Sequence, residues 1–462
     1  MASPELSPGS VPVAPAPAPR GRRMTPEARR AQIIAAAREV FLRHGFAGTR
    51  VRDIAEQAGI TENLVYIRFA TKAEIYEAAV TDPLDALVES LVAAAGRLGS
   101  PELLRSPELL GTADRAVQAD RAERQRVFEE FHRVLLTNML DTAPLLAVAL
   151  FSDPVAGRKY YREVLLPRFT EAVGSVISDV TGWPLDSLRL DVLVEGVLGL
   201  HFGLALDSIF DERALDAADV ARQLAIMFGH GILGGSAQPR APKPAAAVLA
   251  AAAPDTAAPD TAEAGDTETR VRMPAAERRA DIARAAREVF VERGPAGART
   301  KEIAERAGIT EAFMFRVFNG KEELYQEAIE VPARALMARM ERELHEVIVS
   351  GDGGVETMRT LIETGLAVLS ELAPLLVVAL FSEMVRGRRF YRGSVIPALR
   401  QTEEYLTHVP GWDTGAVDPE TLWRALFGVQ FGTVVHHQLT EEPIDAATIA
   451  ARLTRLIATG IR

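Results

Sequence analysis

The sequence contains no cysteine among its 462 residues. A chain without thiols cannot hold a disulfide framework, a thiolate zinc site or an iron–sulfur cluster, and it offers no cysteine nucleophile. No run of 18 or more uninterrupted apolar residues occurs, so we expect no span across a membrane. The first residues lack a charged start and are broken by prolines, unlike a signal peptide, so we expect a cytoplasmic protein.

Signals for strands and for catalysis are also lacking. Helical periodicity is strong instead, with Ile33, Ala37, Val40 and Phe41 on one face of the first helix, so the sequence predicts an all-α protein. No Gly-rich phosphate loop, nucleophile elbow or H-E-x-x-H motif is present. Glu129 and His132 have the spacing of a metal pair, but the second copy of this segment lacks the histidine. We therefore expect no enzyme, no cofactor and no metal site.

The chain contains itself twice. Residues 29–80 align without a gap to residues 278–329, with 27 of 52 positions identical. Residues 144–167 align to 374–397, with 14 of 24 identical. A repeat of this length is too long for a solenoid unit and indicates two copies of one domain pair. The duplicated PLL.VALFS block is predicted to be core packing rather than a ligand contact.

Composition and the repeat together predict six segments. A disordered, basic-ended tail and an Ala/Pro-rich linker are expected because neither can bury enough apolar surface to offset ordering entropy. The expected order is a tail at 1–23, a first helix-turn-helix at 24–80, a first C-terminal helical domain at 81–235, a linker at 236–269, a second helix-turn-helix at 270–330, and a second helical domain at 331–462.

Helix-turn-helix spacing is visible in each copy. A first helix from about Pro26 is expected to end at Gly45, a short helix follows, Gly59 makes the turn, and a third helix begins at Thr61. The string AAREVFLRHGFAGTRVRDIAEQAGITENLVYIRFATKAEIY closely resembles the DNA-binding region of the TetR family of transcriptional regulators. AAREVFVERGPAGARTKEIAERAGITEAFMFRVFNGKEELY, in the second copy, resembles it too.

The resemblance implies double-stranded DNA as a partner and recognition helices at Thr61–Phe69 and Thr310–Phe318. The residues it places at the DNA are Thr49, Arg50, Thr61, Glu62, Asn63, Tyr66, Arg68 and Lys72 in the first copy, and Arg299, Thr310, Ala312, Phe315, Arg316 and Lys321 in the second. Two hydroxyls of the first copy are replaced in the second, by Ala298 and Phe315, which makes DNA binding by the second copy more doubtful.

Charge is distributed in favour of the first copy. The whole chain has a net charge of −11, yet the helix-turn-helix segments carry a local excess of Lys and Arg that can attract phosphate. The frameworks before the recognition helices are nearly identical, whereas positions 63–68 and 312–317 all differ. The two copies are therefore predicted to read different half-sites of an asymmetric operator. Drift in a copy that no longer touches DNA is the alternative.

In proteins that resemble this family, the larger C-terminal domain binds effectors and its last two helices dimerise. We expect these helices at 186–210 with 216–233 and at 418–440 with 445–460. Because both sets lie in one chain, the sequence predicts an intramolecular pseudo-dimer, with a homodimer of two chains left open.

The effector is expected to be small and apolar, and its identity is unknown. The aromatic and polar residues assigned to its pocket are His132, Met139, Phe151, Tyr160, Trp183, His201, Phe202, Phe390, Trp423, Gln430 and Phe431. The resulting interpretation is a regulator, a repressor, that the effector releases from DNA. A helical ligand sensor or protein-interaction scaffold that has lost DNA binding in one or both copies is the alternative.

Overall fold

The computed structural model describes residues 24–98, 113–181, 190–211, 213–230, 274–406 and 417–459. The predicted tail at 1–23, the predicted linker at 236–269 and Trp183 lie outside these ranges. Every regular element within them is a helix, so the all-α prediction is confirmed for the described part of the chain.

The helices follow the same order in each half. In the first half they are α1 (Pro26–Gly48), α2 (Val51–Gln57), α3 (Glu62–Tyr66), α4 (Lys72–Tyr76), η1 (Glu77–Thr81), α5 (Asp82–Leu98), α6 (Ala113–Phe151), α7 (Pro154–Tyr160), η2 (Tyr161–Leu165), α8 (Leu166–Thr181), α9 (Leu190–Phe210) and α10 (Ala217–His230).

The second half repeats this series. Its helices are α11 (Ala275–Gly297), α12 (Thr300–Arg306), α13 (Glu311–Val317), α14 (Lys321–Tyr325), η4 (Gln326–Glu330), α15 (Val331–Ser350), α16 (Val355–Phe381), α17 (Met384–Phe390), η5 (Tyr391–Val395), α18 (Ile396–Leu406), α19 (Pro419–Thr440) and α20 (Ala446–Thr459). The wide π-helical turns η1 and η4, and likewise η2 and η5, occur at equivalent places in the two halves.

Glycine ends the first helix of each half. The backbone of α1 leaves the helical region at Gly45, and that of α11 at Gly294, each with φ of 67°. Glycine adopts this left-handed conformation without a Cβ clash, which is why the predicted end of the first helix is correct. Thr61 does precede α3, but its side chain makes no capping bond, whereas Thr310 accepts one from the Phe313 N–H.

The long apolar helices lie in the core. Gln125–Phe151 within α6 and Val355–Phe381 of α16 are long and apolar enough to cross a membrane by length and composition alone. In each, 67% of the most apolar window is buried inside the structure, as in the core helix of a soluble protein. The first of these stretches ends within the predicted PLL.VALFS block.

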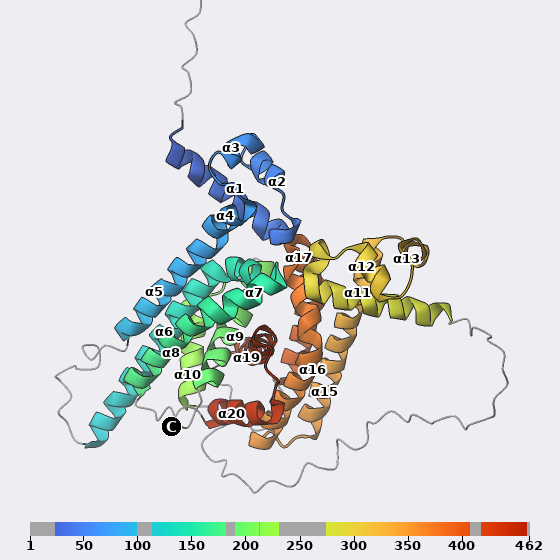
Figure 1. The fold of residues 1–462 in the computed structure, drawn as a ribbon. Helices are drawn as coiled ribbons and strands as arrows, with labels where there is room; N and C mark the ends of the chain where they lie inside the picture. The colour runs from blue at the N-terminus through green and yellow to red at the C-terminus, as the bar shows by residue number, and fades with distance from the viewer. Residues whose placement is uncertain are drawn as a thin grey trace, which may run out of the picture.

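The two halves meet through equivalent helices. Figure 1 shows both helix-turn-helix units along the upper side, with the long helices below them. The helix α9 packs along α19, while α10 packs on α6 and α20 on α16 within their own halves. Phe151 and Phe381 are the last residues of α6 and α16, and they stack on each other with ring centroids 4.7 Å apart.

Candidate nucleic-acid interface and ligand pockets

The first recognition helix presents two different sides. Val65 and Phe69 are buried, and they attach α3 to the rest of its domain. Between them Tyr66 and Ile67 are 49% and 60% exposed, an unusual position for side chains of this size on a short helix. Arg68 is also exposed and makes no ion pair with any described residue. An exposed aromatic ring at the end of α3, with an exposed aliphatic side chain and a guanidinium in the turn that follows, suits contact with base edges and phosphates.

Most of the predicted DNA-facing residues of the first copy lie on this surface. The exposed ones are Arg50, Thr61, Glu62, Asn63, Tyr66 and Arg68. Thr49 is different, because only 1% of it is exposed and its hydroxyl donates to the Gly45 carbonyl at 2.7 Å. This placement removes Thr49 from the exposed set, and its hydroxyl instead holds the turn after α1.

Lys72 holds the same turn from the other side. Its Nζ donates to the carbonyls of Phe46 at 2.8 Å and Thr49 at 3.0 Å, and it lies 4.3 Å from the centre of the Phe46 ring. Burial lowers the pKa of Lys72. The residue therefore connects the first turn of α4 to the end of α1.

The second copy has a similar recognition helix, α13. Ala312, Phe315 and Arg316 are exposed on α13, while Met314 and Phe318 are buried. Thr310 and Arg299 are exposed as well. Lys321 resembles Lys72, since its Nζ donates to the Ala298 carbonyl at 2.7 Å, and burial together with the charge of Arg386 lowers its pKa.

Carboxylates neutralise several cations of the second copy. Arg279 contacts Glu323 at 2.7 Å and Glu327 at 3.1 Å, and it also donates to the Val317 carbonyl. Its counterpart in the first copy, Arg30, lies 4.5 Å over the Phe69 ring. Cations already paired with carboxylates attract phosphate less strongly, so Arg279 contributes less to DNA attraction than an unpaired cation would.

Two predicted ligand residues of the first half form a buried histidine pair. His132 Nδ1 lies 3.1 Å from His201 Nε2, and the second ring contacts the Val197 carbonyl at 2.6 Å. Burial lowers the pKa of His201 to about 4 and that of His132 well below its ordinary value. The rings of Phe128 and Phe228 pack on His132. Both imidazoles are therefore neutral at physiological pH.

Several buried polar atoms have no partner among the described residues. They include His132 Nε2 in the first half and Gln430 Oε1 and Trp423 Nε1 in the second. Gln430 stands where alignment of α9 with α19 places His201, and Ile362 stands at the His132 position. Unpartnered buried polar atoms call for an explanation such as a bound molecule or water.

The other predicted ligand residues are scattered. Phe151, Phe202 and Phe431 surround a void of about 30 Å³ between the halves. Tyr160 donates to Asp85 at 2.8 Å and is half-buried. Met139 and Phe390 are buried in the core. The structure thus brings the predicted ligand residues together in small groups rather than in one cavity.

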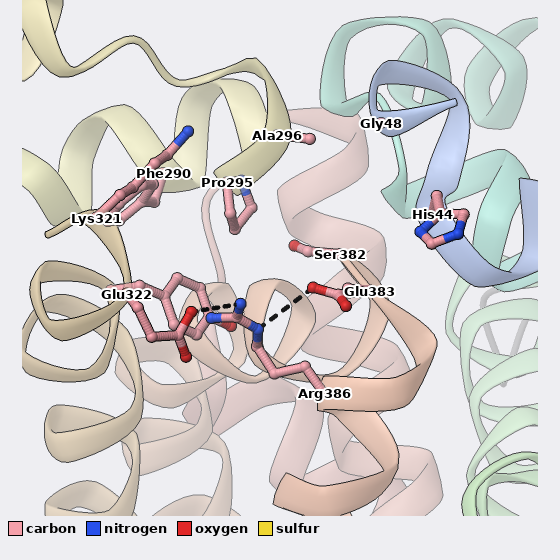
Figure 2. Close-up of a pocket in the computed structure, with 11 residues that line it drawn as sticks. His44, Gly48, Phe290, Pro295, Ala296, Lys321, Glu322, Ser382, Glu383 and Arg386 are labelled. Carbon is pink, nitrogen blue, oxygen red and sulfur yellow. Dashed lines mark hydrogen bonds and ion pairs between the residues drawn. The ribbon is translucent and has the colours of Figure 1, made fainter. Parts of the chain in front are cut away.

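A larger pocket lies under the second helix-turn-helix. It measures about 310 Å³ and is lined by residues of both halves, with His44 and Gly48 on one side and Phe290, Pro295 and Lys321 on the other. Figure 2 shows Arg386 on its floor, pointing toward Glu322 and Glu383. These ion pairs measure 2.7 and 3.5 Å.

One substitution between the copies accounts for this pocket. Phe46 is the first-half counterpart of Pro295, and it packs against Phe41 and Tyr76 with centroids 6.2 and 5.0 Å away. Pro295 lacks the aromatic ring that fills this space in the first half, so the second copy keeps an opening there. A neighbouring pocket of about 230 Å³ is more apolar, and its lining includes Leu150, Val291, Val378 and Leu439.

Charged residues at the contact of α9 with α19 were missed by sequence reasoning. Tyr391 donates to Asp207 Oδ1 at 2.7 Å, and Arg424 forms an ion pair with the same carboxylate. Tyr161 lies 2.8 Å from His436 Nδ1, and the other ring nitrogen contacts Glu195 at 3.2 Å. The shared G-x-x-F-G pattern of the two helices was the available signal, since it aligns them in register.

These features define a class of helix-turn-helix proteins in which a three-helix DNA-binding domain precedes a larger helical domain. The profile of the family described as "Bacterial regulatory proteins, tetR family" matches residues 33–79 and again residues 282–328. The chain therefore carries two tandem copies of the N-terminal region of this family of bacterial regulatory proteins.

Three curated relatives resemble short stretches of the chain. The HTH-type transcriptional activator FasR of Mycolicibacterium smegmatis is 35% identical over 72 residues, which are 16% of this chain and 33% of the relative. The regulator TtgR and the probable regulator ArpR of Pseudomonas putida are each 48% identical over 59 residues, 12% of this chain and 28% of theirs. The chain thus spans about a third or less of the length of these relatives.

A solved structure was also matched. A Clostridium perfringens putative fatty acid metabolism regulator is 16% identical, with 42% of this chain and 95% of the other covered and a TM-score of 0.30. A TM-score this low carries no information on the arrangement of the whole chain.

Proposed function

We propose that this regulator binds an operator through two unlike recognition helices, α3 and α13, held in one chain. The observation that carries the proposal is the exposed surface at the end of α3, where Tyr66 of the helix and Ile67 and Arg68 of the following turn are exposed between the buried Val65 and Phe69. Because base readout depends on a few side chains at these positions, two different helices favour an asymmetric site. The larger excess of Lys and Arg over Asp and Glu in the first helix-turn-helix segment favours a larger contribution from the first copy.

The two halves are proposed to act as a single-chain pseudo-dimer. The contact of α9 with α19, in which Asp207 meets Arg424 and Glu195 meets His436, supports this pairing. A pair of helix-turn-helix units on one side of the molecule suits two half-sites about one helical turn, roughly 34 Å, apart. The proposal includes the domain boundaries predicted from the sequence. It also includes a cytoplasmic location for both pairs of domains.

A small, largely apolar effector is proposed to release the protein from DNA, which makes it a repressor. The buried polar atoms of His132, Trp423 and Gln430 support such a ligand, because a mostly apolar molecule with one or two polar groups would satisfy them. Release requires the effector to prefer a state in which the recognition helices are displaced. Lys72 and Lys321 join the end of the first helix to α4 and α14, which lead into the larger helical domains, so they are placed to transmit that change.

The alternative from another class is a ligand sensor or scaffold without DNA binding. The paired cations of the second copy, such as Arg279, favour it for that copy. The experiment that separates the two is selection of bound DNA from a random pool, with the mass of the complex. An asymmetric site bound by one chain supports the proposal. A palindrome bound by two chains assigns reading to one copy, and no enriched site overturns the regulator.

A further inference from the structure

The residues of α9 and α19 that face each other recur at a regular spacing. The two helices run antiparallel, and facing positions are four residues apart along each helix. Two glycine pairs form the centre, because a Cβ added at Gly199 or Gly203 would overlap the Cα of a facing glycine. A carboxylate faces a basic side chain at each end. In order, the facing pairs are Glu195 with His436, Gly199 with Gly432, Gly203 with Gly428, and Asp207 with Arg424.

The same two helices are equivalent in the repeat. Gly199, Phe202 and Gly203 match Gly428, Phe431 and Gly432 with a constant offset. With that alignment the charged ends do not match. Glu195 corresponds to Arg424, and Asp207 corresponds to His436. The first helix therefore carries a carboxylate at each end of its face, and the second carries a guanidinium and an imidazole.

Pairing of either face with a second copy of itself would juxtapose like groups. A symmetric contact of two α9 helices would place Glu195 against Asp207 at both ends. A symmetric contact of two α19 helices would place Arg424 against His436. Glu195, Asp207 and His436 are 6%, 4% and 6% exposed, so water cannot screen these groups. A buried charge without its counter-charge is strongly unfavourable.

We propose that the faces of α9 and α19 are a matched pair in which each accepts the other and rejects a second copy of itself. Tyr161 and Tyr391 reinforce the match, because each hydroxyl contacts the charged end of the opposite half, His436 or Asp207. Glu420 pairs with Arg424 from its own helix and does not discriminate between partners. This inference deepens the proposed pairing of the halves and rests on it.

Cross-linking in the full chain tests the pairing directly, since the sequence has no cysteine of its own. A Cβ at Gly196 lies 3.8 Å from Val429 Cγ1, so Gly196→Cys with Val429→Cys places two thiols side by side. Oxidation followed by peptide mass spectrometry is expected to find this disulfide. The control mixes a Gly196→Cys chain with a Leu200→Cys chain, because Leu200 is the equivalent of Val429. We expect no link between these two chains.

Exchange of charges should redirect the pairing. Asp207→His with His436→Asp leaves the composition unchanged but makes each face complementary to itself. When these two substitutions are added to the Gly196→Cys, Val429→Cys chain, we expect at least tenfold less of the 196–429 disulfide. When they are added to the mixed Gly196→Cys and Leu200→Cys chains, we expect the interchain 196–200 disulfide to appear. Further exchange by Glu195→Arg and Arg424→Glu restores opposite charges between the two faces, so the 196–429 disulfide should return.

An unchanged yield of the 196–429 disulfide in the twofold exchange would overturn the proposal. The proposal would also be overturned if the fourfold exchange did not form the 196–429 disulfide or was unfolded by circular dichroism. In either case, restoring opposite charges between the two faces would not have restored the pairing. The readout needs no DNA. A failed operator selection would therefore refute the proposed function while leaving this result intact, and a failed cross-link would leave DNA binding untouched.

Discussion

Two basic residues near the first recognition helix have different tasks. Arg68 is exposed, whereas Lys72 is half-buried and bonded to the Phe46 and Thr49 carbonyls. Replacement of Lys72 would disturb the domain as well as any phosphate contact. Arg68 is therefore the cleaner probe of DNA contact, and Lys72 belongs to the joint between α1 and α4.

Arg68→Ala is expected to weaken operator binding by about 10- to 100-fold, the range for loss of one bidentate base contact. Arg342→Ala, which removes an exposed arginine from α15, serves as the charge-matched control and should change binding little. Titration of fluorescent operator at several salt concentrations measures both. Equal affinities for the two variants would rule out a direct role for Arg68.

The buried pair His132 and His201 should make stability depend on pH. The folded pKa of His201 lies near 4, below its ordinary 6.5, so the unfolded chain binds protons first as the pH falls. The contribution of His201 to the free energy of unfolding is complete above pH 6.5. It is lost between pH 6.5 and about 4 and amounts to roughly 3 kcal/mol at most.

His132→Ile with His201→Gln gives this pair the residues of the second half. The variant should show a shallower fall of melting temperature between pH 6.5 and 4 than the parent protein. Parallel thermal melts across that range measure the difference. Identical slopes would mean that the pair does not contribute to the acid sensitivity.

At the scale of elements, the crossing of α9 and α19 depends on the absence of side chains. Alanine normally stabilises a helix interior relative to glycine. At Gly203 the sign should reverse, because the added Cβ overlaps the Cα of Gly428 and the helices must separate. We expect Gly203→Ala to lower the free energy of unfolding by about 1–3 kcal/mol, the usual cost of overpacking.

Gly393→Ala is the matched control, since no atom lies within 4 Å of its added Cβ. Denaturant unfolding of both variants gives the comparison. If both substitutions had the same small effect, the close approach of the two helices would not contribute to stability.

The sequence predicted elements whose signals are local and repeated. The helix end at Gly45, the start of each recognition helix and the all-α class follow from periodicity, glycine placement and the second copy. The end of the first recognition helix does not, because α3 ends at Tyr66, before the predicted Phe69. The charge pairs at α9 and α19 could not be predicted in the same way. Glu195 and His436 are 241 positions apart, and only the packing register decides that they face each other. Thr49 was misjudged because its burial depends on the neighbouring turn.

At the scale of the whole molecule, the two recognition helices should determine the symmetry of the operator. Replacing residues 312–317 by the first-copy hexapeptide of 63–68 gives both domains the same reading surface. The preferred site is then expected to change from asymmetric to palindromic. Selection from a random pool, run beside the parent chain, measures the change.

The control places the second-copy hexapeptide in the first domain, which should give a different palindrome or weaker binding. An unchanged asymmetric site in the first graft would show that α13 does not read bases, and the second domain would then serve another purpose.

The exchanged charges of α9 and α19 also have a consequence for inheritance. A gene that encoded only the first half would produce a face with buried carboxylates and no counter-charge, and a gene for the second half would have the opposite defect. Under the proposed matching, neither half can form a symmetric pair with a second copy of itself. Under the proposed matching, neither half can be lost without leaving the other unpaired, and the two halves must continue to evolve together.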